Sequence, residues 1–345
     1  MNASLLDVGG IMASEMAEQP AVLGRLAARA PADIATIRAV IPSPLAGVVF
    51  VARGSSDNAA VFGRYLTEIA AKRPAGLAAP SLYTRYHAEV DWSGYLAVAL
   101  SQSGATPEIL TTCSAIRSAG ATVVGITNEP ASPMADVTDV LLSTDAGHER
   151  AVPATKTMTA QMLSVATVAA ALGSGHVPGA LFGDGGPGTH ELPKAVSVIL
   201  ADPTPAQELA GRWAASDRLV VAGRGLAYAS ALEIALKVKE TTGILAEGMS
   251  TADLRHGPIA TAFAGAPVLL IDAGGPAAAD TSELLEELEV RGASGVTLPL
   301  PGGLTEPAAA IAAVVRGQQL AMTLALAKGF NPDSPTGLTK VTPTT

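Results

Sequence analysis

The sequence predicts an α/β fold of two successive units, each a doubly wound, mainly parallel sheet flanked by helices in three layers. The chain has 345 residues, which suggests two domains or one large α/β unit with ample core. Hydrophobic residues make up 48% of the chain and charged residues only 15%, which indicates a well-buried globular protein. Aromatic residues are scarce, at 3%, and many residues are Ala, Val and Leu, as is typical of helices packed on parallel strands.

Short apolar runs alternate with helical segments along the first half of the chain. A continuous apolar run bounded by turn residues is typical of a strand that is buried on both faces of a parallel sheet. The predicted elements are strands within 48–56, 95–100 and 121–128, a candidate fourth strand at 139–144, and helices ending near Ala71 and covering 107–116.

The same alternation returns in the second half. Residues 173–194 are dense in Gly and Pro and are the best candidate for a linker between the halves. Near the C-terminus, Gly329 is a natural residue to end a helix. The predicted elements are a strand and helix over 218–237, strands within 266–275 and 295–300, and a helix from about Pro307 to Lys328.

The openings of the two halves match each other. Residues 49–60 (VFVARGSSDNAA) align without gaps on residues 220–231 (VVAGRGLAYASA), so that Arg53 falls on Arg224. An internal duplication of one doubly wound α/β unit is the simplest explanation.

The turn SQSGAT, at residues 101–106, crowds polar side chains against a glycine between a predicted strand and a predicted helix. Thr106 is a good N-cap, so the N–H groups of the first helical turn point toward Ser101, Gln102 and Ser103. A helix N-terminus ringed by hydroxyls attracts an anion, most often a phosphate. For this stretch alone, an ordinary βα loop is the alternative. The second half has no Ser-Gln-Ser group, which favours one ligand per chain.

Charge and cysteine usage narrow the class of protein. The net charge is −9 and no basic run occurs, which argues against a nucleic-acid surface. The single cysteine, Cys113, rules out an internal disulfide or a cysteine metal cluster, and its place in a predicted helix indicates a packed thiol. No Lys or Arg precedes Arg25 and no apolar run reaches membrane-spanning length, so we expect a soluble, cytoplasmic protein without membrane contacts.

Four motifs follow one another along the chain: the S-Q-S-G-x-T turn, EIALKVKE at 233–240, DLRHGP at 253–258 and GLTKV at 337–341. In order and spacing they resemble the paired sugar isomerase (SIS) domains of the aminosugar-phosphate enzymes. That family includes the isomerase half of glutamine:fructose-6-phosphate amidotransferase and stand-alone glucosamine-6-phosphate deaminases. The implied domains are an N-terminal helical segment with a first SIS domain over 1–190, a second SIS domain over 191–330, and a tail over 331–345.

The resemblance assigns a phosphorylated sugar to the first repeat. The segment ERAVPATKT resembles a family motif in which the backbone at Val152 and the side chain two residues later touch the sugar, but Ala154 has no hydroxyl for this contact. Glu149 and Lys156 of this segment are expected to be structural ion-pair residues. Arg53 either adds a charged contact or packs outward, and we favour the structural interpretation. The implied substrate-binding residues are Ser56, Ser101, Gln102, Ser103, Thr106, Val152 and Ala154.

The resemblance also assigns four catalytic residues. It implies that Glu240 shuttles a proton between C1 and C2 of the open-chain sugar, with Lys237 beside it on the same helix face. It implies that His256 opens the sugar ring and is supplied by a neighbouring subunit, so we expect a homodimer. Lys340 matches a lysine that forms a Schiff base with a ketose phosphate, in a tail that folds back over the sugar. No metal and no organic cofactor is implied.

Composition alone favours simpler interpretations of these residues. Glu233 and Lys237, four apart, would form a solvated pair with Glu240 as a bystander. The Pro- and Gly-rich tail after Gly329 would be disordered. The place of these residues in the family motifs favours catalysis instead.

The residue after the initiator Met favours one reaction within the family. In the amidotransferase a catalytic Cys follows the initiator Met, whereas Asn2 stands there in this sequence, so we expect no glutamine-derived ammonia. The predicted reaction is therefore D-glucosamine 6-phosphate plus water to D-fructose 6-phosphate and ammonia. The alternatives are a fructosamine-6-phosphate deglycase, a galactosamine-6-phosphate deaminase, an ammonia-dependent synthase and a non-catalytic phosphosugar-binding regulator.

Overall fold

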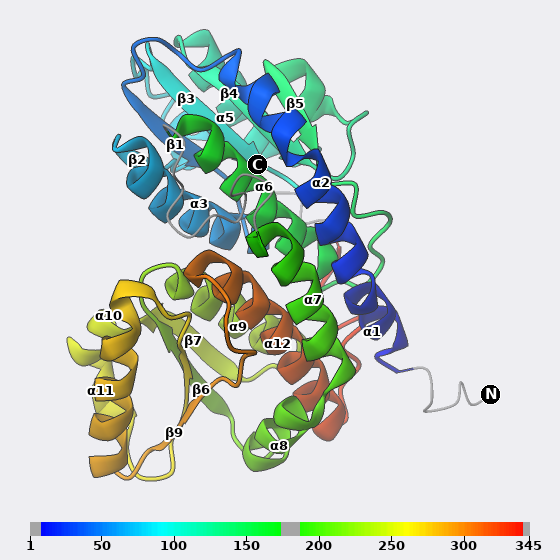
Figure 1. Cartoon of the computed structure of the whole chain (residues 1–345), viewed down its shortest axis with the longest axis vertical. Coiled ribbons are helices and arrows are strands. Elements are labelled where there is room, and N and C mark those ends of the chain that lie inside the picture. Colours follow the sequence, from blue (N-terminus) through cyan, green and yellow to red (C-terminus); the bar gives the residue numbers. More distant parts are fainter. Residues whose placement is uncertain (1–7, 174–186, 341–345) are drawn as a thin grey trace. The chain divides into compact units, whose positions relative to one another are not determined.

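The computed structural model describes residues 8–173 and 187–340, and the chain divides into two compact units (Figure 1). Each unit carries one parallel sheet, so the prediction of an α/β fold is confirmed. In described residues, the β1–β5 unit comprises 22–147, 157–173 and 187–189, and the β6–β9 unit comprises 8–21, 148–156 and 190–340.

The sheet of the β1–β5 unit has five parallel strands in the order β2-β1-β3-β4-β5. The order reverses between β1 and β3, and in open α/β sheets ligands bind beyond the carboxyl ends of the strands at such a switch point. The strands are β1 (Gly47–Val51), β2 (Ala75–Leu77), β3 (Tyr95–Leu100), β4 (Thr122–Thr127) and β5 (Val140–Ser143). Between residues 19 and 172 the helices are α2 (Gln19–Arg38), α3 (Ser55–Ala71), α4 (Ser81–Thr84), α5 (Pro107–Ser118), the 3-10 turn η1 (Pro133–Val137) and α6 (Lys156–Leu172).

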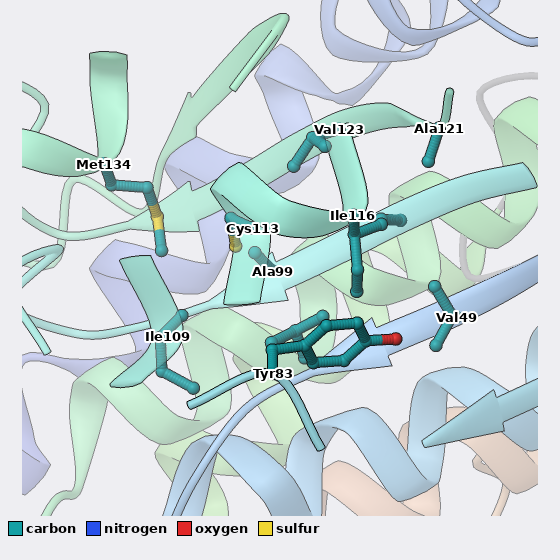
Figure 2. Packing of buried hydrophobic residues seen from close by; sticks show 11 residues of the cluster. Val49, Tyr83, Ala99, Ile109, Cys113, Ile116, Ala121, Val123 and Met134 are labelled. Atoms are coloured by element: carbon teal, nitrogen blue, oxygen red, sulfur yellow. The ribbon is translucent and has the colours of Figure 1, made fainter. Parts of the chain in front are cut away.

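Both faces of this sheet are covered. On one face, side chains of β1, β3 and β4 pack against α4 and α5, as Figure 2 shows for Val49, Ala99, Val123, Tyr83, Ile109, Cys113 and Ile116. On the other face, Phe50 packs so closely on Gly63 of α3 that an added Cβ would lie 2.7 Å from its ring. Burial raises the pKa of Cys113 to about 12, and the thiol is fully buried, which confirms the predicted packed thiol.

The sheet of the β6–β9 unit has four parallel strands in the order β7-β6-β8-β9. Figure 1 shows α10 and α11 on one face of this sheet and α9 and α12 on the other. The strands are β6 (Arg218–Gly223), β7 (Leu245–Ser250), β8 (Pro267–Ile271) and β9 (Ser294–Thr297). The remaining helices are α1 (Gly10–Ala17), α7 (Pro187–Ala201), α8 (Thr204–Trp213), α9 (Ala227–Thr242), α10 (Thr251–Arg255), α11 (Ala278–Val290) and α12 (Glu306–Ala327), with 3-10 turns η2 (Pro258–Thr261) and η3 (Gly275–Ala277).

Among the described helices, α12 alone is long and apolar enough to cross a membrane by length and composition, with a mean hydropathy of 1.4. Of that apolar window, 83% is buried inside the protein. The helix packs on α8 and α9, and Gly317 lies so close to Ile234 of α9 that an added Cβ would overlap it. Because protein already covers its apolar surface, α12 is a core helix of the β6–β9 unit.

The two sheets repeat one topology. The order β2-β1-β3-β4 in one sheet corresponds to β7-β6-β8-β9 in the other. In both, the first strand is followed by a glycine with a φ of 60°, Gly54 after β1 and Gly225 after β6. The shared order and the shared left-handed turn support the duplication predicted from the sequence.

The predicted linker at 173–194 is wrong in its second part. Helix α7 begins at Pro187, and proline is tolerated at the first position of a helix because its missing N–H has no partner there anyway. Residues 174–186 lie outside the described residues. Two strands also lack a clear sequence signal: β2 has only three residues, none of them buried, and β7 mixes exposed and buried positions.

Candidate active site

The turn between β3 and α5 is held in shape by its own polar groups. Gly104, with a φ of 59°, donates its N–H to Ser101 Oγ at 3.1 Å, and an added Cβ would overlap the Ser132 hydroxyl. Thr106 is the N-cap of α5, as predicted, but its Oγ1 lies 3.2 Å from Ser101 Oγ. Within the described residues no Thr106 side-chain hydrogen bond caps α5, but the Ile109 and Leu110 N–H groups both donate to the Thr106 carbonyl at 3.1 Å. Because Pro107 has no N–H, the Glu108 N–H is the donor of this first turn that remains available to an anion.

The other predicted phosphate residues lie at the same edge of the sheet. Ser56 is buried in the first turn of α3, which follows β1, and β1 pairs with β3 in parallel. Gln102 and Ser103 are partly exposed, and the Gln102 carbonyl accepts the Asn128 N–H at 3.0 Å. Parallel strands end at one edge, so both turns lie at the switch point between β1 and β3.

Arg53 forms a bidentate ion pair with Glu108, both N–O distances being 2.9 Å. Glu108 is buried in the first turn of α5. At the matching position of the second repeat, Arg224 pairs with Asp280 of the first turn of α11 at 2.9 Å. Because the same pair recurs in both repeats, it supports the structural interpretation of Arg53, in which the arginine ties two neighbouring turns together.

The corresponding place in the second repeat is filled by a carboxylate of the chain itself. A Cβ added to Gly225 would lie 3.1 Å from Glu306 Oε1, and one added to Gly275 would overlap the same carboxylate. Burial raises the pKa of Glu306, and a hydrogen bond from the Leu226 backbone opposes this shift. An internal carboxylate at this turn supports the prediction of one ligand per chain.

Helix α9 carries a buried charged cluster. The side chain of Lys237 is 1% exposed and that of Glu233 is fully buried, with Nζ 3.4 Å from Glu233 Oε1. The same Nζ lies 2.5 Å from Glu240 Oε2, as the spacing of three residues predicts. Burial opposes the charge on Lys237, but Glu233, Glu240 and Glu149 outweigh it and raise its pKa. The pair is therefore not solvated, and the simpler interpretation of these residues is wrong.

The C-terminal tail adds Lys340 to this cluster. Its Nζ lies 2.7 Å from Glu149 Oε2 and donates a hydrogen bond to the Ala151 carbonyl at 2.8 Å. Glu149 is buried, and its Oε1 accepts the Thr155 N–H at 2.9 Å. Glu149 is also the last and smallest of the contributions that act on the pKa of Lys237, which it helps to raise. The tail is thus ordered as far as Lys340, while residues 341–345 lie outside the described residues.

The segment between Glu149 and Lys156 is fixed by backbone hydrogen bonds and ion pairs. The Val152 N–H donates to the Asp333 carbonyl at 2.9 Å, and Ala154 is partly buried. Lys156 is buried and its Nζ lies 2.7 Å from Glu18. Glu149 and Lys156 are therefore both in ion pairs, as expected, although with Lys340 and Glu18.

His256 lies at the exposed C-terminal end of α10, where its backbone N–H binds the Asp253 carbonyl at 3.1 Å. In the part of the chain that the structure describes, no hydrogen bond links its ring to the α9 residues. That a neighbouring subunit supplies His256 to the active site stays a prediction. Over residues 8–173 and 187–340, no group of three or more His, Cys, Asp and Glu side chains is arranged to hold a metal ion.

Comparisons with known proteins agree with this architecture. The SIS domain family matches residues 47–171 and 214–298, one stretch in each repeat. The glutamine–fructose-6-phosphate aminotransferase (isomerizing) of Pyrococcus horikoshii is 32% identical over 317 residues, which cover 85% of this chain and 51% of the relative. The chain thus spans about half the length of this curated relative.

Two solved structures share the fold. The C-terminal domain of glucosamine-fructose-6-phosphate aminotransferase from Francisella tularensis superposes with a TM-score of 0.80 at 24% identity, covering 97% of this chain and all of that domain. Glucosamine-6-phosphate deaminase from Thermotoga maritima gives a TM-score of 0.76 at 23% identity, covering 95% and 98% of the two chains. With a family match in each repeat and two sheets of one topology, the protein belongs to the SIS domain family.

Proposed function

We propose that the protein is an isomerising aminosugar-phosphate deaminase that converts D-glucosamine 6-phosphate and water to D-fructose 6-phosphate and ammonia. The observation that carries the proposal is the position of Lys340 on Glu149, whose charge also acts on Lys237 beside Glu240. The proposal gives the amine nucleophile of Lys340 and the proton-carrying carboxylate of Glu240 to one site. Isomerisation requires the carboxylate, and the amine assists the release of the nitrogen.

Each step of the proposed reaction uses one of the assigned residues. His256, from the neighbouring subunit of a homodimer, opens the sugar ring by acid/base catalysis. Glu240 moves a proton from C2 to C1 while a second proton passes from the C2 amino group to the C1 oxygen, which converts the open-chain aminoaldose to an imine at C2. The amine of Lys340 attacks C2 and ammonia leaves, and water then hydrolyses the Schiff base to fructose 6-phosphate and free lysine. One water is consumed and one ammonia is released.

Lys340 must lose its proton before it attacks a carbon. Glu149 Oε2, 2.7 Å from Nζ, is placed to take that proton. Because Glu149 is fully buried, water competes little for this hydrogen bond. We therefore assign Glu149 as the partner that holds Lys340 in place at rest and receives its proton in the reaction.

The test of the proposed function is ammonia release from a panel of substrates. We expect the highest kcat/KM for glucosamine 6-phosphate, measured with a coupled ammonia assay against galactosamine 6-phosphate and fructosamine 6-phosphates. A preference for fructosamine 6-phosphates would instead identify a deglycase. Net synthesis from fructose 6-phosphate and ammonia as the dominant activity would identify a synthase. Binding of fructose 6-phosphate with no turnover in the whole panel would leave a phosphosugar-binding regulator.

Ser103→Ala should weaken substrate binding more than it slows turnover. Ser103 is partly exposed in the turn that precedes α5, and the proposal gives it a hydrogen bond to the phosphate. Contacts to a phosphate remote from the reacting carbons bind ground state and transition state alike, so KM should rise about 10-fold with kcat nearly unchanged. Steady-state kinetics measure both constants.

Ser118→Ala, at an exposed position near the end of α5, is the matched control and should leave KM unchanged. If Ser103→Ala has the same KM as the wild type, Ser103 does not bind the phosphate of the substrate.

A further inference from the structure

Asp333 lies in the C-terminal tail and caps the first helix of the chain. The N-cap of α1 is Gly9, which has no side chain to offer and has a φ of 86°. Asp333 supplies the missing acceptors, with Oδ2 accepting the Gly9 N–H at 3.0 Å and Oδ1 the Met12 N–H at 2.7 Å. Its carboxylate is buried, and a negative charge at a helix N-terminus is favourable. The cap thus joins residues more than 300 positions apart.

Helix α1 is in turn fixed to the segment that receives Lys340. The buried carboxylate of Glu15 accepts the N–H groups of Arg150, at 2.5 Å, and Ala151, at 3.2 Å. Ala151 also packs with Met12 and Met16 of α1. The Ala151 N–H therefore binds α1 while its carbonyl accepts the Lys340 ammonium.

The tail is held at both ends of a short exposed stretch. Of the six residues 334–339, only Pro335 is buried. Asp333 anchors the start of this stretch through its carboxylate and through its carbonyl, which accepts the Val152 N–H. Lys340 anchors its end on Glu149 and Ala151. A segment with no helix, strand or continuous buried face depends on such anchors for its order.

We propose that Asp333 is a positioning residue: by capping α1 it fixes the tail, and so it holds the Lys340 amine at Glu149. The proposal rests on the proposed function, because it assigns Asp333 to the placement of the Schiff-base lysine. Asp333 acts through Lys340 alone and needs no contact with the sugar.

The test compares Asp333→Asn with the wild type in two kinds of measurement, the reactivity of the enzyme and the access of trypsin to Lys340. The amide keeps the shape but loses the charge and one acceptor, so the tail should detach more often. The rate at which borohydride traps fructose 6-phosphate on Lys340 should fall about 10-fold, with a similar fall in kcat and a KM within about twofold of the wild type. Trypsin should cleave after Lys340 several-fold faster in the variant, as followed by mass spectrometry, and this second measurement needs no activity.

Asp202→Asn is the matched control, since Asp202 is an exposed aspartate that caps the Thr204 N–H in the same unit. It should change neither measurement. In a Lys340→Ala background, Asp333→Asn should alter the residual turnover by less than about twofold, because two residues acting through one group are not additive. If Asp333→Asn does not fold, Asp333→Ser, which keeps one acceptor, replaces it.

The outcomes separate this proposal from the proposed function. In one outcome the wild type gives no adduct and no ammonia, but trypsin cleaves Asp333→Asn after Lys340 faster than it cleaves the wild type. This outcome would overturn the proposed function and support the anchoring role of Asp333. A wild type that gives the adduct, with an Asp333→Asn variant trapped and cleaved at wild-type rates, would overturn the positioning role and leave the function standing.

Discussion

Lys340→Ala should abolish most ammonia release, by about 10³-fold or more, because it removes the nucleophile that displaces the nitrogen. Binding of fructose 6-phosphate, measured by calorimetry, should change little, since the proposed phosphate contacts come from the turns at Ser56 and Ser101. Borohydride with fructose 6-phosphate should trap an adduct on Lys340 of the wild type, as located by peptide mass spectrometry, and none on the variant.

Lys340→Arg separates the nucleophile from the ion pair. Arginine keeps a positive charge for Glu149 but stays protonated, so the variant should keep an ordered tail without turnover. Lys239→Ala, at an exposed position of α9, is the control and should react as the wild type does. Full ammonia release by Lys340→Ala, or a wild type that binds fructose 6-phosphate well without forming an adduct, would make the Schiff-base role wrong.

Glu240→Gln should lower kcat by about 10²- to 10⁴-fold, the range expected when a positioned proton-transfer group is lost. The amide has nearly the same shape, so the hydrogen bond with Lys237 is weakened without a cavity. Loss of one of the three carboxylates that raise the pKa of Lys237 should also lower that pKa. Substrate carrying deuterium at C2 tests the role directly, because the wild type should pass some of the label to C1 of fructose 6-phosphate.

Glu247→Gln, at an exposed position of β7, is the control for this variant and should keep the wild-type kcat. Mixing Glu240→Gln with His256→Ala extends the test to the proposed homodimer. If each site takes His256 from the partner subunit, half of the sites in each mixed dimer are intact, and random exchange should restore about one quarter of the wild-type activity. If verified mixed dimers recover no activity, the site is not shared between subunits. If Glu240→Gln keeps the kcat of the wild type, Glu240 is not the proton carrier.

Several parts of the fold can be predicted from the sequence because interactions between residues close along the chain determine them. The strands β1, β3, β4 and β8 are buried on both faces, so they read as continuous apolar runs. The start of α5 follows from Thr106 and Pro107, and the end of α12 from Gly329, whose φ of 78° suits a glycine.

Other parts had no such signal. The strand β7 contains Gly248, where an added Cβ would overlap the backbone of α9, so the glycine serves close packing that no periodicity reveals. Helix α7 begins inside a stretch rich in Gly and Pro, where local preference indicated a linker. In both cases a tertiary contact or a special helix position outweighed the propensity of the residues.

For the candidate site, the sequence by itself determined the residues that lie close along one element. Lys237 and Glu240 meet because residues three apart share a helix face, and the Ser101 turn precedes a helix because its N-cap and proline require it. Only the tertiary structure decided the long-range partners: Lys340 on Glu149, 191 positions away, and Asp333 on the N-terminus of α1. The residues that flank a carboxylate in the sequence do not indicate which distant amine or N–H group it will bind. The burial that makes these pairs strong exists only once α1, α9, the 149–156 segment and the tail have packed together.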